Sequence, residues 1–273
     1  MKRGRERIVL YAALSLFAFL AVFPFLWAVL TAFKSYEESI RIPPTFIPEN
    51  FSLENFRIVL KKFPFSAFYA NTFLMILFVI IFQLCFCSMA AYAFARLHFP
   101  GRELIFWSLL ALLMAPGQIF LIPNYETMVK LHLADTVTAL WLPKVFSAFG
   151  TYLLREFFRG IPRSLDEAAI LDGCNYFQIY LWIHLPLIRP ALSSLAILTA
   201  ISAFKDLMWP LTVNNSMDKM TLSSGLSMLI GEHTTIYPQV MAGGLIAVLP
   251  MLLLFFIFQK QFIEGIATAG IKQ

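Results

Sequence analysis

The sequence predicts an all-α membrane protein, a bundle of transmembrane helices. Apolar residues make up 59% of the 273 residues and charged residues only 14%, whereas an ordinary soluble domain has about 45–50% apolar and about 25% charged residues. The mean hydropathy is +0.74. Uncharged stretches long enough to cross about 30 Å of hydrocarbon recur along the chain, with polar breaks between them. These observations exclude a water-soluble globule.

Composition also argues against nucleic-acid binding, disulfides and metal sites. The net charge is +5, but the 21 lysines and arginines are too scattered along the chain to form a basic face for nucleic acid. The three cysteines form no C-x-x-C pair, and Cys85 and Cys87 are two positions apart on one predicted helix, so they point in different directions. We therefore expect this chain to bind no metal and no cofactor.

Six segments are predicted to span the membrane. Helices are predicted rather than strands because backbone groups in lipid must be satisfied within the segment, and these segments far exceed the roughly 9–11 residues of a barrel strand. The first segment is too long for a signal-peptide core and is expected to remain as a membrane anchor. The predicted spans are residues 8–33, 67–95, 104–123, 137–158, 190–213 and 239–262.

The distribution of lysine and arginine predicts the orientation. One set of alternate connections holds 12 of these residues and the other holds 7, while Lys144 and Lys205 fall inside predicted spans. Positive residues are retained on the cytoplasmic side, so both termini are expected in the cytoplasm. The 12 predicted cytoplasmic residues are Lys2, Arg3, Arg5, Arg7, Arg96, Arg102, Arg155, Arg159, Arg163, Arg189, Lys260 and Lys272.

The predicted cytoplasmic segment 160–188 is expected to contain a short, well-capped helix. Ser164 stands where an N-cap belongs, and Glu167 follows three residues later to complete a capping box. Gly173 supplies a left-handed stop after about eight residues. A short helix with a small-residue surface can sit in a cleft of another protein. The alternative is that Glu167 merely caps its own helix and that the alanines after it reflect helix propensity.

A second helix is predicted to follow the first within the same segment. Asn175 and Gln178 resemble another helix start, and the apolar run behind them is expected to stop at Pro186. The segment is therefore expected to form a short helix, a turn and another short helix between the fourth and fifth spans.

Seven residues of this segment resemble the EAA signature of permease subunits of binding-protein-dependent ABC importers. The matching residues are Glu167, Ala168, Ala169, Gly173, Ile183, Leu185 and Pro186. Residues 99–101, 207–211 and 262–267 are similar to the carbohydrate-uptake branch of that family, especially to its maltose-permease-like six-span subunit. The resemblance covers nearly the whole chain. One departure is Phe204-Lys205, where the family commonly has a Trp-Asn pair.

The resemblance implies a six-transmembrane-helix ABC importer permease bundle in a bacterial or archaeal cytoplasmic (inner) membrane, with segment 160–188 as a coupling helix. The implied partners are two copies of a cytoplasmic ABC ATPase, a second related permease in a heterodimer, an extracytoplasmic solute-binding protein and a sugar-like solute. No G-x-x-x-x-G-K-[ST] loop occurs, since no glycine is followed by lysine. We therefore expect ATP and Mg to be used by the partner ATPase, and this chain to be a transport subunit and not an enzyme.

The translocation pathway is predicted from polar residues within the spans. Gln83 lies near the middle of the second span, and Gln118 follows a proline-glycine break, with Asn124 close behind. Such a break frees backbone carbonyls that lipid cannot satisfy, so it is expected to line a cavity. Lys205 and Asp206 are expected near the outer interface, where a snorkelling lysine with a neighbouring acid is the alternative to solute contact.

Two other classes of protein were weighed. An integral-membrane enzyme needs a catalytic cluster, but the four histidines are widely separated and no G-x-S-x-G or H-E-x-x-H pattern occurs. A passive channel or facilitator has the same composition, yet an ungated pore has no use for a docking lever.

In the related permeases, the region corresponding to residues 214–238 approaches the binding protein. A plain connecting loop is the alternative.

Overall fold

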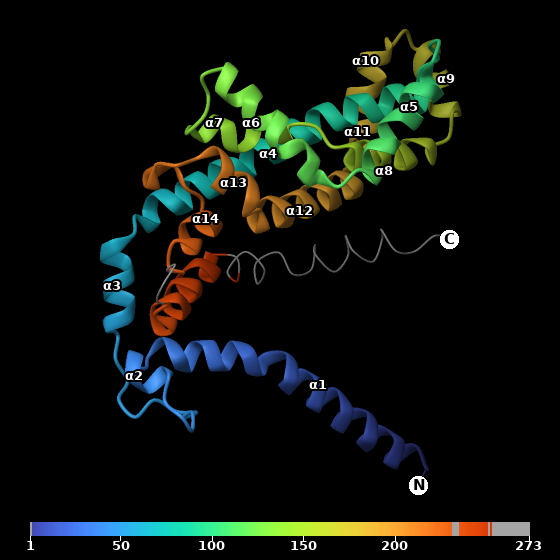
Figure 1. Ribbon diagram of the computed structural model, residues 1–273. Coiled ribbons are helices and arrows are strands. Elements are labelled where there is room, and N and C mark those ends of the chain that lie inside the picture. Colours follow the sequence, from blue (N-terminus) through green and yellow to red (C-terminus); the bar gives the residue numbers. More distant parts are fainter. Residues whose placement is uncertain (1, 231–234, 251, 253–273) are drawn as a thin grey trace. The chain divides into compact units, whose positions relative to one another are not determined.

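A computed structural model describes residues 2–230, 235–250 and 252 (Figure 1). The described residues form helices and turns and no strand, which confirms the predicted all-α fold class. The chain divides into two compact units. Unit 1 comprises Met1–Phe65 and Gly225–Leu253, and unit 2 comprises Ser66–Ser224 with Leu254–Gln273.

Unit 1 holds the first predicted span and most of the segment that connects it to the second. The side-chain amide of Asn55 donates to the carbonyls of Ala32 and Lys34, each at 2.9 Å, and so joins the end of the first helix to the helix that follows the loop. The helices of unit 1 are α1 (Lys2–Ala32), α2 (Tyr36–Ser39), α3 (Glu54–Lys62) and a helix over Tyr237–Pro250.

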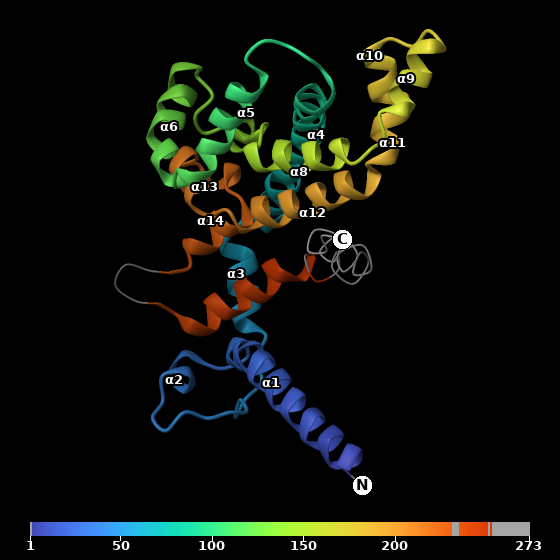
Figure 2. The ribbon, with the colours of Figure 1, turned by 90° about the vertical axis from the view of Figure 1, so that its right-hand side faces the viewer.

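Unit 2 carries every residue predicted for the coupling segment and the pathway. Figures 1 and 2 show α9 and α10 at one end of this unit and α6 and α13 at the other. Its helices are α4 (Phe65–Arg96), α5 (Arg102–Ala111), α6 (Leu121–Lys130), α7 (Val137–Trp141), α8 (Ala148–Arg159), α9 (Ser164–Leu171), α10 (Tyr176–Gln178), α11 (Leu185–Leu187), α12 (Arg189–Lys205), α13 (Met208–Val213) and the start of α14 (Leu222–Ser227). Between them lie 3-10 turns at Leu112–Met114, Gly117–Phe120, Leu142–Lys144 and Met217–Lys219, and a π-helical turn at Ile179–His184.

Two apolar clusters hold unit 2 together. The first joins α4, α8 and α12 through Cys87, Leu154 and Leu195, and the second joins α4, α7 and α13 around Leu140 and Trp209. The approach of α8 to α12 is close at Gly150, because a Cβ built there would lie 3.1 Å from a methyl carbon of Leu195. The indole of Trp209 donates to the Ala139 carbonyl at 2.9 Å, which satisfies its one polar atom within the cluster.

The first two predicted spans are continuous helices. Leu10–Ala32 and Phe65–Arg96 are each long and apolar enough to cross a membrane. Three further pairs of helices pass the same test only when each bent pair is counted as one span, which gives up to five spans among the described residues. Of the sixth predicted span, 239–262, only 239–250 and 252 are described. The number six and the cytoplasmic location of both termini stay predictions.

The predicted spans 104–123, 137–158 and 190–213 are each broken, the first of them at the expected proline-glycine pair. The helical axis turns by 102° between Arg102–Met114 and Gly117–Lys130, and by 47° between Val137–Lys144 and Ala148–Arg159. In the third region α12 ends before Asp206, whose backbone is extended, and α13 begins two residues later.

Local chemistry explains these breaks. Pro116 has no N–H to donate, and its ring disfavours a helical conformation at Ala115, which is extended with ψ 130°. Ser147 starts α8 by accepting a hydrogen bond from the Gly150 N–H at 3.0 Å. The Asp206 carboxylate accepts a weaker bond from the Trp209 N–H at 3.4 Å at the start of α13.

Candidate functional site

The end of α9 has the predicted left-handed glycine. Gly173 has φ +83°, and its N–H donates to the Ile170 carbonyl at 3.0 Å. The Cys174 N–H donates to the Ala169 carbonyl at 2.9 Å, and the two bonds together form a Schellman motif. Both the eight-residue length of α9 and its glycine stop are therefore confirmed.

The start of α9 differs from the prediction. Ser164 is the first helical residue and not the N-cap, and no side chain caps this end, so the Ser164–Glu167 capping box is wrong. The backbone supplies the acceptors instead, because the Asp166 and Glu167 N–H groups donate to the Arg163 carbonyl at 2.9 and 3.1 Å. Because Arg163 already has helical dihedral angles, its carbonyl can accept these bonds, and the Ser164 hydroxyl is not needed as a cap.

The second helix starts as predicted but does not stop at Pro186. Asn175 and Gln178 exchange two hydrogen bonds of 2.8 and 2.9 Å in a capping box. The helix then passes through the π-helical turn and Pro186 to Leu187, and breaks only at Ile188 with a bend of 76°. The π-helical turn widens the backbone just ahead of the proline ring, where a regular helix would clash with it.

Asp166, next to the signature glutamate, anchors α9 to the body of unit 2. Its carboxylate contacts Arg96 at the end of α4 at 3.2 Å and also bonds to Nε2 of His184 in the π-helical turn. The His184 side chain is 0% exposed and that of Arg96 is 6% exposed. His184 is enclosed by the rings of Tyr92 and Phe158, with centroids 5.2 and 5.7 Å away. One carboxylate thus ties three segments together.

The signature residues divide between an outer and an inner face. Glu167 and Ala168 are exposed, and Ala169 is buried against its own chain. Ile183 and Leu185 are half-buried, and Leu185 packs on the first apolar cluster, while Pro186 is exposed. Exposed apolar residues surround the outer face: Leu165, Ile170, Leu171 (89% exposed), Tyr176, Phe177 and Trp182. Exposed apolar side chains gathered in this way are typical of surfaces that contact another molecule.

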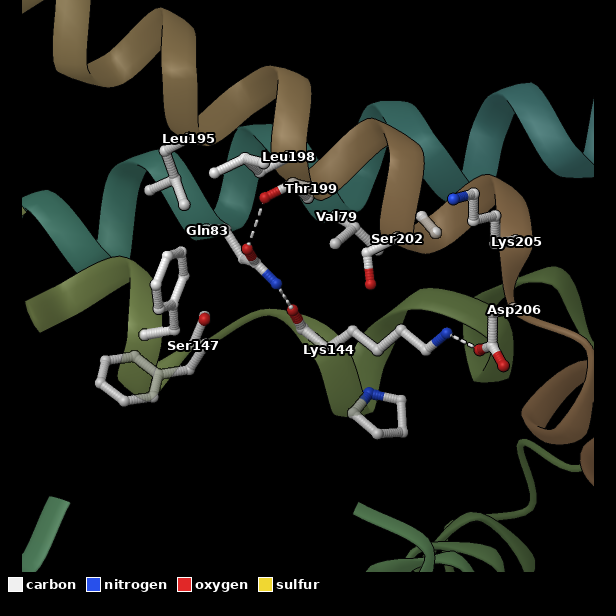
Figure 3. A pocket seen from close by; sticks show the side chains of 14 residues that line it. Val79, Gln83, Lys144, Ser147, Leu195, Leu198, Thr199, Ser202, Lys205 and Asp206 are labelled. Atoms are coloured by element: carbon white, nitrogen blue, oxygen red, sulfur yellow. Dashed lines mark hydrogen bonds and ion pairs between the residues drawn. The ribbon is translucent and has the colours of Figure 1, made fainter. Parts of the chain in front are cut away.

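A second candidate site is a cavity of about 690 Å³ beside α4 and α12 (Figure 3). Its walls include three of the predicted pathway residues, Gln83, Lys205 and Asp206. Gln83 accepts a hydrogen bond from the Thr199 hydroxyl at 2.9 Å and donates to the Lys144 carbonyl at 2.8 Å. Gln83 therefore holds the 3-10 turn at Lys144 against α12, which makes it a positioning residue of the cavity wall.

Gln118 and Asn124, the other two predicted pathway residues, line a neighbouring cavity of about 320 Å³. Both cavities are bordered by Pro143, Lys144 and Asp206. The ammonium of Lys144 forms an ion pair with the Asp206 carboxylate, and both side chains are about four-fifths buried. Asp206 therefore forms its ion pair with Lys144 and not with Lys205, which precedes it in the sequence. All five predicted pathway residues lie around this one ion pair.

Sequence reasoning missed Lys144, Thr199, Asp166 and His184. Lys144 and Asp206 carry a signal, since each is an ionisable residue inside or at the end of a predicted span and such groups pair within the protein. The pairing of Asp166 with residues 70 and 18 positions away along the chain has no local signal. Among the described residues, no group of three or more His, Cys, Asp or Glu could hold a metal ion.

Asp135 fixes the start of the predicted outer segment 214–238, of which 231–234 lie outside the described residues. Its carboxylate accepts hydrogen bonds from the Asn215 and Ser216 N–H groups at 3.0 and 2.9 Å and from the Ser216 hydroxyl. These hydrogen bonds lower the pKa of Asp135 below its ordinary value, and the bond from the Ser216 hydroxyl has the largest effect. The segment is therefore held firmly to the turn before α7.

The cavity with Gln83 combines hydroxyl groups with aromatic rings. Ser147, Thr199 and Ser202 supply hydroxyls, and the partly exposed rings of Phe146 and Phe149 line the same wall. Such a wall suits a solute that carries both hydroxyl groups and apolar C–H faces.

The chain is similar along its full length to known proteins, although no family profile matches it. It is 33% identical over 278 residues to the arabinooligosaccharides transport system permease protein AraQ of Halalkalibacterium halodurans, covering 100% of both chains. It is 29% identical to the inner membrane ABC transporter permease protein YcjP of Escherichia coli, covering 99% of this chain and 98% of that protein. The crystal structure of a bacterial ABC transporter that imports the acidic polysaccharide alginate contains a chain with TM-score 0.81 and 24% identity, covering 95% of this chain and 97% of that one.

Replacing Asp166 by alanine tests the anchor of α9. Asp166→Ala leaves the buried Arg96 and His184 without their common partner, so we expect a loss of about 3 kcal/mol in the free energy of unfolding. The measurement is chemical denaturation of the full chain in detergent. The control is Asp172→Ala at the other end of α9, where the side chain is exposed. Equal stability of the two variants would contradict the anchoring role.

Proposed function

This chain belongs to the family of permease subunits of sugar ABC transporters, and from that premise we propose that it forms one half of the membrane pathway of an ATP-driven sugar importer. The observation that carries the proposal is segment 160–188, in which the first three signature residues lie on a short helix with an exposed outer face and a fixed inner face. A passive channel has no comparable use for such a helix.

The proposed role of α9 is to couple transport to a separate ATPase. The exposed Glu167 and Ala168, with Leu171 beside them, would form the docking surface. The exposed apolar side chains around them would be removed from water by a partner, which is favourable by about 25 cal/mol per Å². ATP-driven closure of the ATPase pair can move the permease only if the docking free energy differs between its two states.

Rigid attachment is what makes α9 suitable as a lever. The carboxylate of Asp166 connects it to Arg96 and His184, and the Schellman motif at Gly173 fixes its exit. A displacement at the docking surface is therefore passed to α4 and the π-helical turn rather than lost in a loose loop.

The proposed pathway runs by the two cavities that share the Lys144–Asp206 pair. The hydroxyl groups and phenyl rings of the larger cavity favour a saccharide. The name of the relative AraQ supports an oligosaccharide as the cargo. Residues 214–238 would face the solute-binding protein, with Asp135 holding their start in place.

The chain would work in a bacterial or archaeal cytoplasmic membrane, as the name of the relative YcjP suggests, with both termini in the cytoplasm. Its partners would be two copies of the ATPase, a second permease in a heterodimer and an extracytoplasmic binding protein. ATP and Mg would be bound by the ATPase and not by this chain.

Uptake into vesicles tests the function and the coupling helix together. We expect vesicles that carry the complete transporter to accumulate an arabinooligosaccharide only with the ATPase present and ATP inside. Glu167→Lys should lower this uptake by about tenfold or more, because a like charge at a docking contact costs several kcal/mol. Since Glu167 is exposed and caps no helix, the variant should insert and fold normally.

The matched control is Glu126→Lys, at an exposed glutamate of α6 at the opposite end of unit 2. Normal uptake by Glu167→Lys would refute the coupling role. Uptake by the wild type without ATP or the ATPase would instead refute the importer and favour a facilitator.

A charge exchange tests the ion pair between the two cavities. Lys144→Asp and Asp206→Lys should each destabilise the chain and impair uptake, because each leaves two like charges in a largely buried site. The double variant should recover part of the stability and part of the uptake, with a coupling energy of about 1–3 kcal/mol in stability. Thermal unfolding and uptake of all four proteins give the measurement. Additive effects of the two substitutions would show that the pair does not matter.

A further inference from the structure

A third cavity, of about 640 Å³, lies in unit 2 between the end of α4, α5 and α8, near α9. Five of the twelve cations predicted for the cytoplasmic side gather on its walls: Arg96, Arg102, Arg155, Arg159 and Arg163. Two carboxylates, Glu103 and Glu156, lie on the same walls, and a third, Asp166, pairs with Arg96 from outside them, which leaves a formal excess of two positive charges. We call this cavity the arginine pocket. The proposed pathway does not use it.

The charges inside the arginine pocket are incompletely neutralised. The Arg155 side chain is 8% exposed, yet its guanidinium contacts Glu103 only at 3.3 Å and Glu156 at 3.7 Å. Charge-assisted hydrogen bonds between such groups are normally about 2.7–2.9 Å long. The remaining face of this guanidinium lies 3.8 Å from the centroid of the Phe106 ring. The Nε of Arg155 also donates to the Phe94 carbonyl at 3.3 Å, so all the polar contacts of this buried cation are long, as expected for a group that an anion could bind more closely.

The rim of the pocket carries two more arginines with weak or no partners. Arg159 contacts Glu156 at 3.4 Å, and the guanidinium of Arg163 forms no ion pair with any described residue. Both residues are exposed. Guanidinium groups present planar sets of N–H donors that match the oxygens of a phosphate. Several of them around one cavity therefore point to a phosphate-bearing ligand.

An apolar border adjoins these arginines. Trp107 lines the pocket and is 65% exposed, and its neighbours Leu104 and Ile105 on α5 are also exposed. Basic pockets between transmembrane helices on the cytoplasmic side bind the headgroups of anionic lipids, and tryptophan is enriched at that interface. A soluble phosphate compound would make no use of the apolar border, whereas the acyl chains of a lipid would cover it.

We propose that the arginine pocket binds the phosphate of an anionic phospholipid headgroup, of the phosphatidylglycerol or cardiolipin type. The bound headgroup would also act on α9. Arg96 both lines the pocket and pairs with Asp166, and Arg163 immediately precedes α9. This last consequence rests on the proposed function, whereas the binding itself does not.

The test is lipid retention by the full chain in nanodiscs of phosphatidylcholine with a fraction of phosphatidylglycerol. Arg159→Gln/Arg163→Gln removes two exposed charges and leaves the buried Arg96 and Arg155 in place, so the fold is preserved. We expect the phosphatidylglycerol that copurifies with this variant, after transfer to detergent, to fall about 25-fold, since each of the two basic residues contributes about fivefold near an anionic surface. The control is Arg189→Gln, an exposed arginine of the same predicted side outside the pocket.

Two further measurements identify the source of the phosphate. Inorganic phosphate at millimolar concentration should not displace the lipid and should not raise the unfolding temperature of the lipid-free chain. If inorganic phosphate alone raised the unfolding temperature as much as phosphatidylglycerol does, the lipid proposal would be wrong. The pocket would then be assigned to a soluble phosphate compound. Equal lipid retention by the double variant and by Arg189→Gln would overturn the site altogether. Neither result depends on transport activity, so failure here is distinguishable from failure of the importer proposal.

Discussion

The carboxylate of Asp166 is the interaction on which the functional part of unit 2 depends. It is shared by Arg96 and His184, which come from the end of α4 and from the π-helical turn, and both partners are almost fully buried. Breaking one member of such a buried cluster leaves an uncompensated charge, so the three segments keep one arrangement. The helix α9, whose outer face is exposed, is therefore also firmly attached to the body of unit 2.

Broken helices are the second constraint, and they place the cavities. A helix that is interrupted at membrane depth must have its free backbone groups satisfied by protein or by water. In this chain the breaks at Pro116, Ser147 and Asp206 lie next to the two cavities that share Lys144 and Asp206. Gln83 satisfies the carbonyl of Lys144 at one of these breaks. The polar residues of the spans are therefore structural supports of the cavity walls as well as candidate solute contacts.

Arg96 connects two sites that would otherwise be separate. One of its nitrogens pairs with Asp166, another donates to the carbonyls of Phe158 and Ile161, and the same side chain lines the arginine pocket. Charge in that pocket and the position of α9 are thus linked through a single side chain. The arginines of the predicted cytoplasmic side, whose excess predicts the orientation of the chain, gather in part around one cavity.

The sequence by itself determined the features that depend on neighbouring residues. Apolar length predicted helices and the membrane, Gly173 predicted the left-handed stop, and Asn175 with Gln178 predicted the second helix start, because each signal is local in the chain. Two other local signals gave wrong predictions. The Arg163 carbonyl, and not the Ser164 side chain, accepts the first hydrogen bonds of α9, and the second helix continues through a π-helical turn and beyond Pro186. Only the tertiary structure decided that Lys144 pairs with Asp206 and that Asp166 joins Arg96 and His184. Those partners are 18 to 70 residues apart, and the energy that selects them comes from burial, which no stretch of sequence contains.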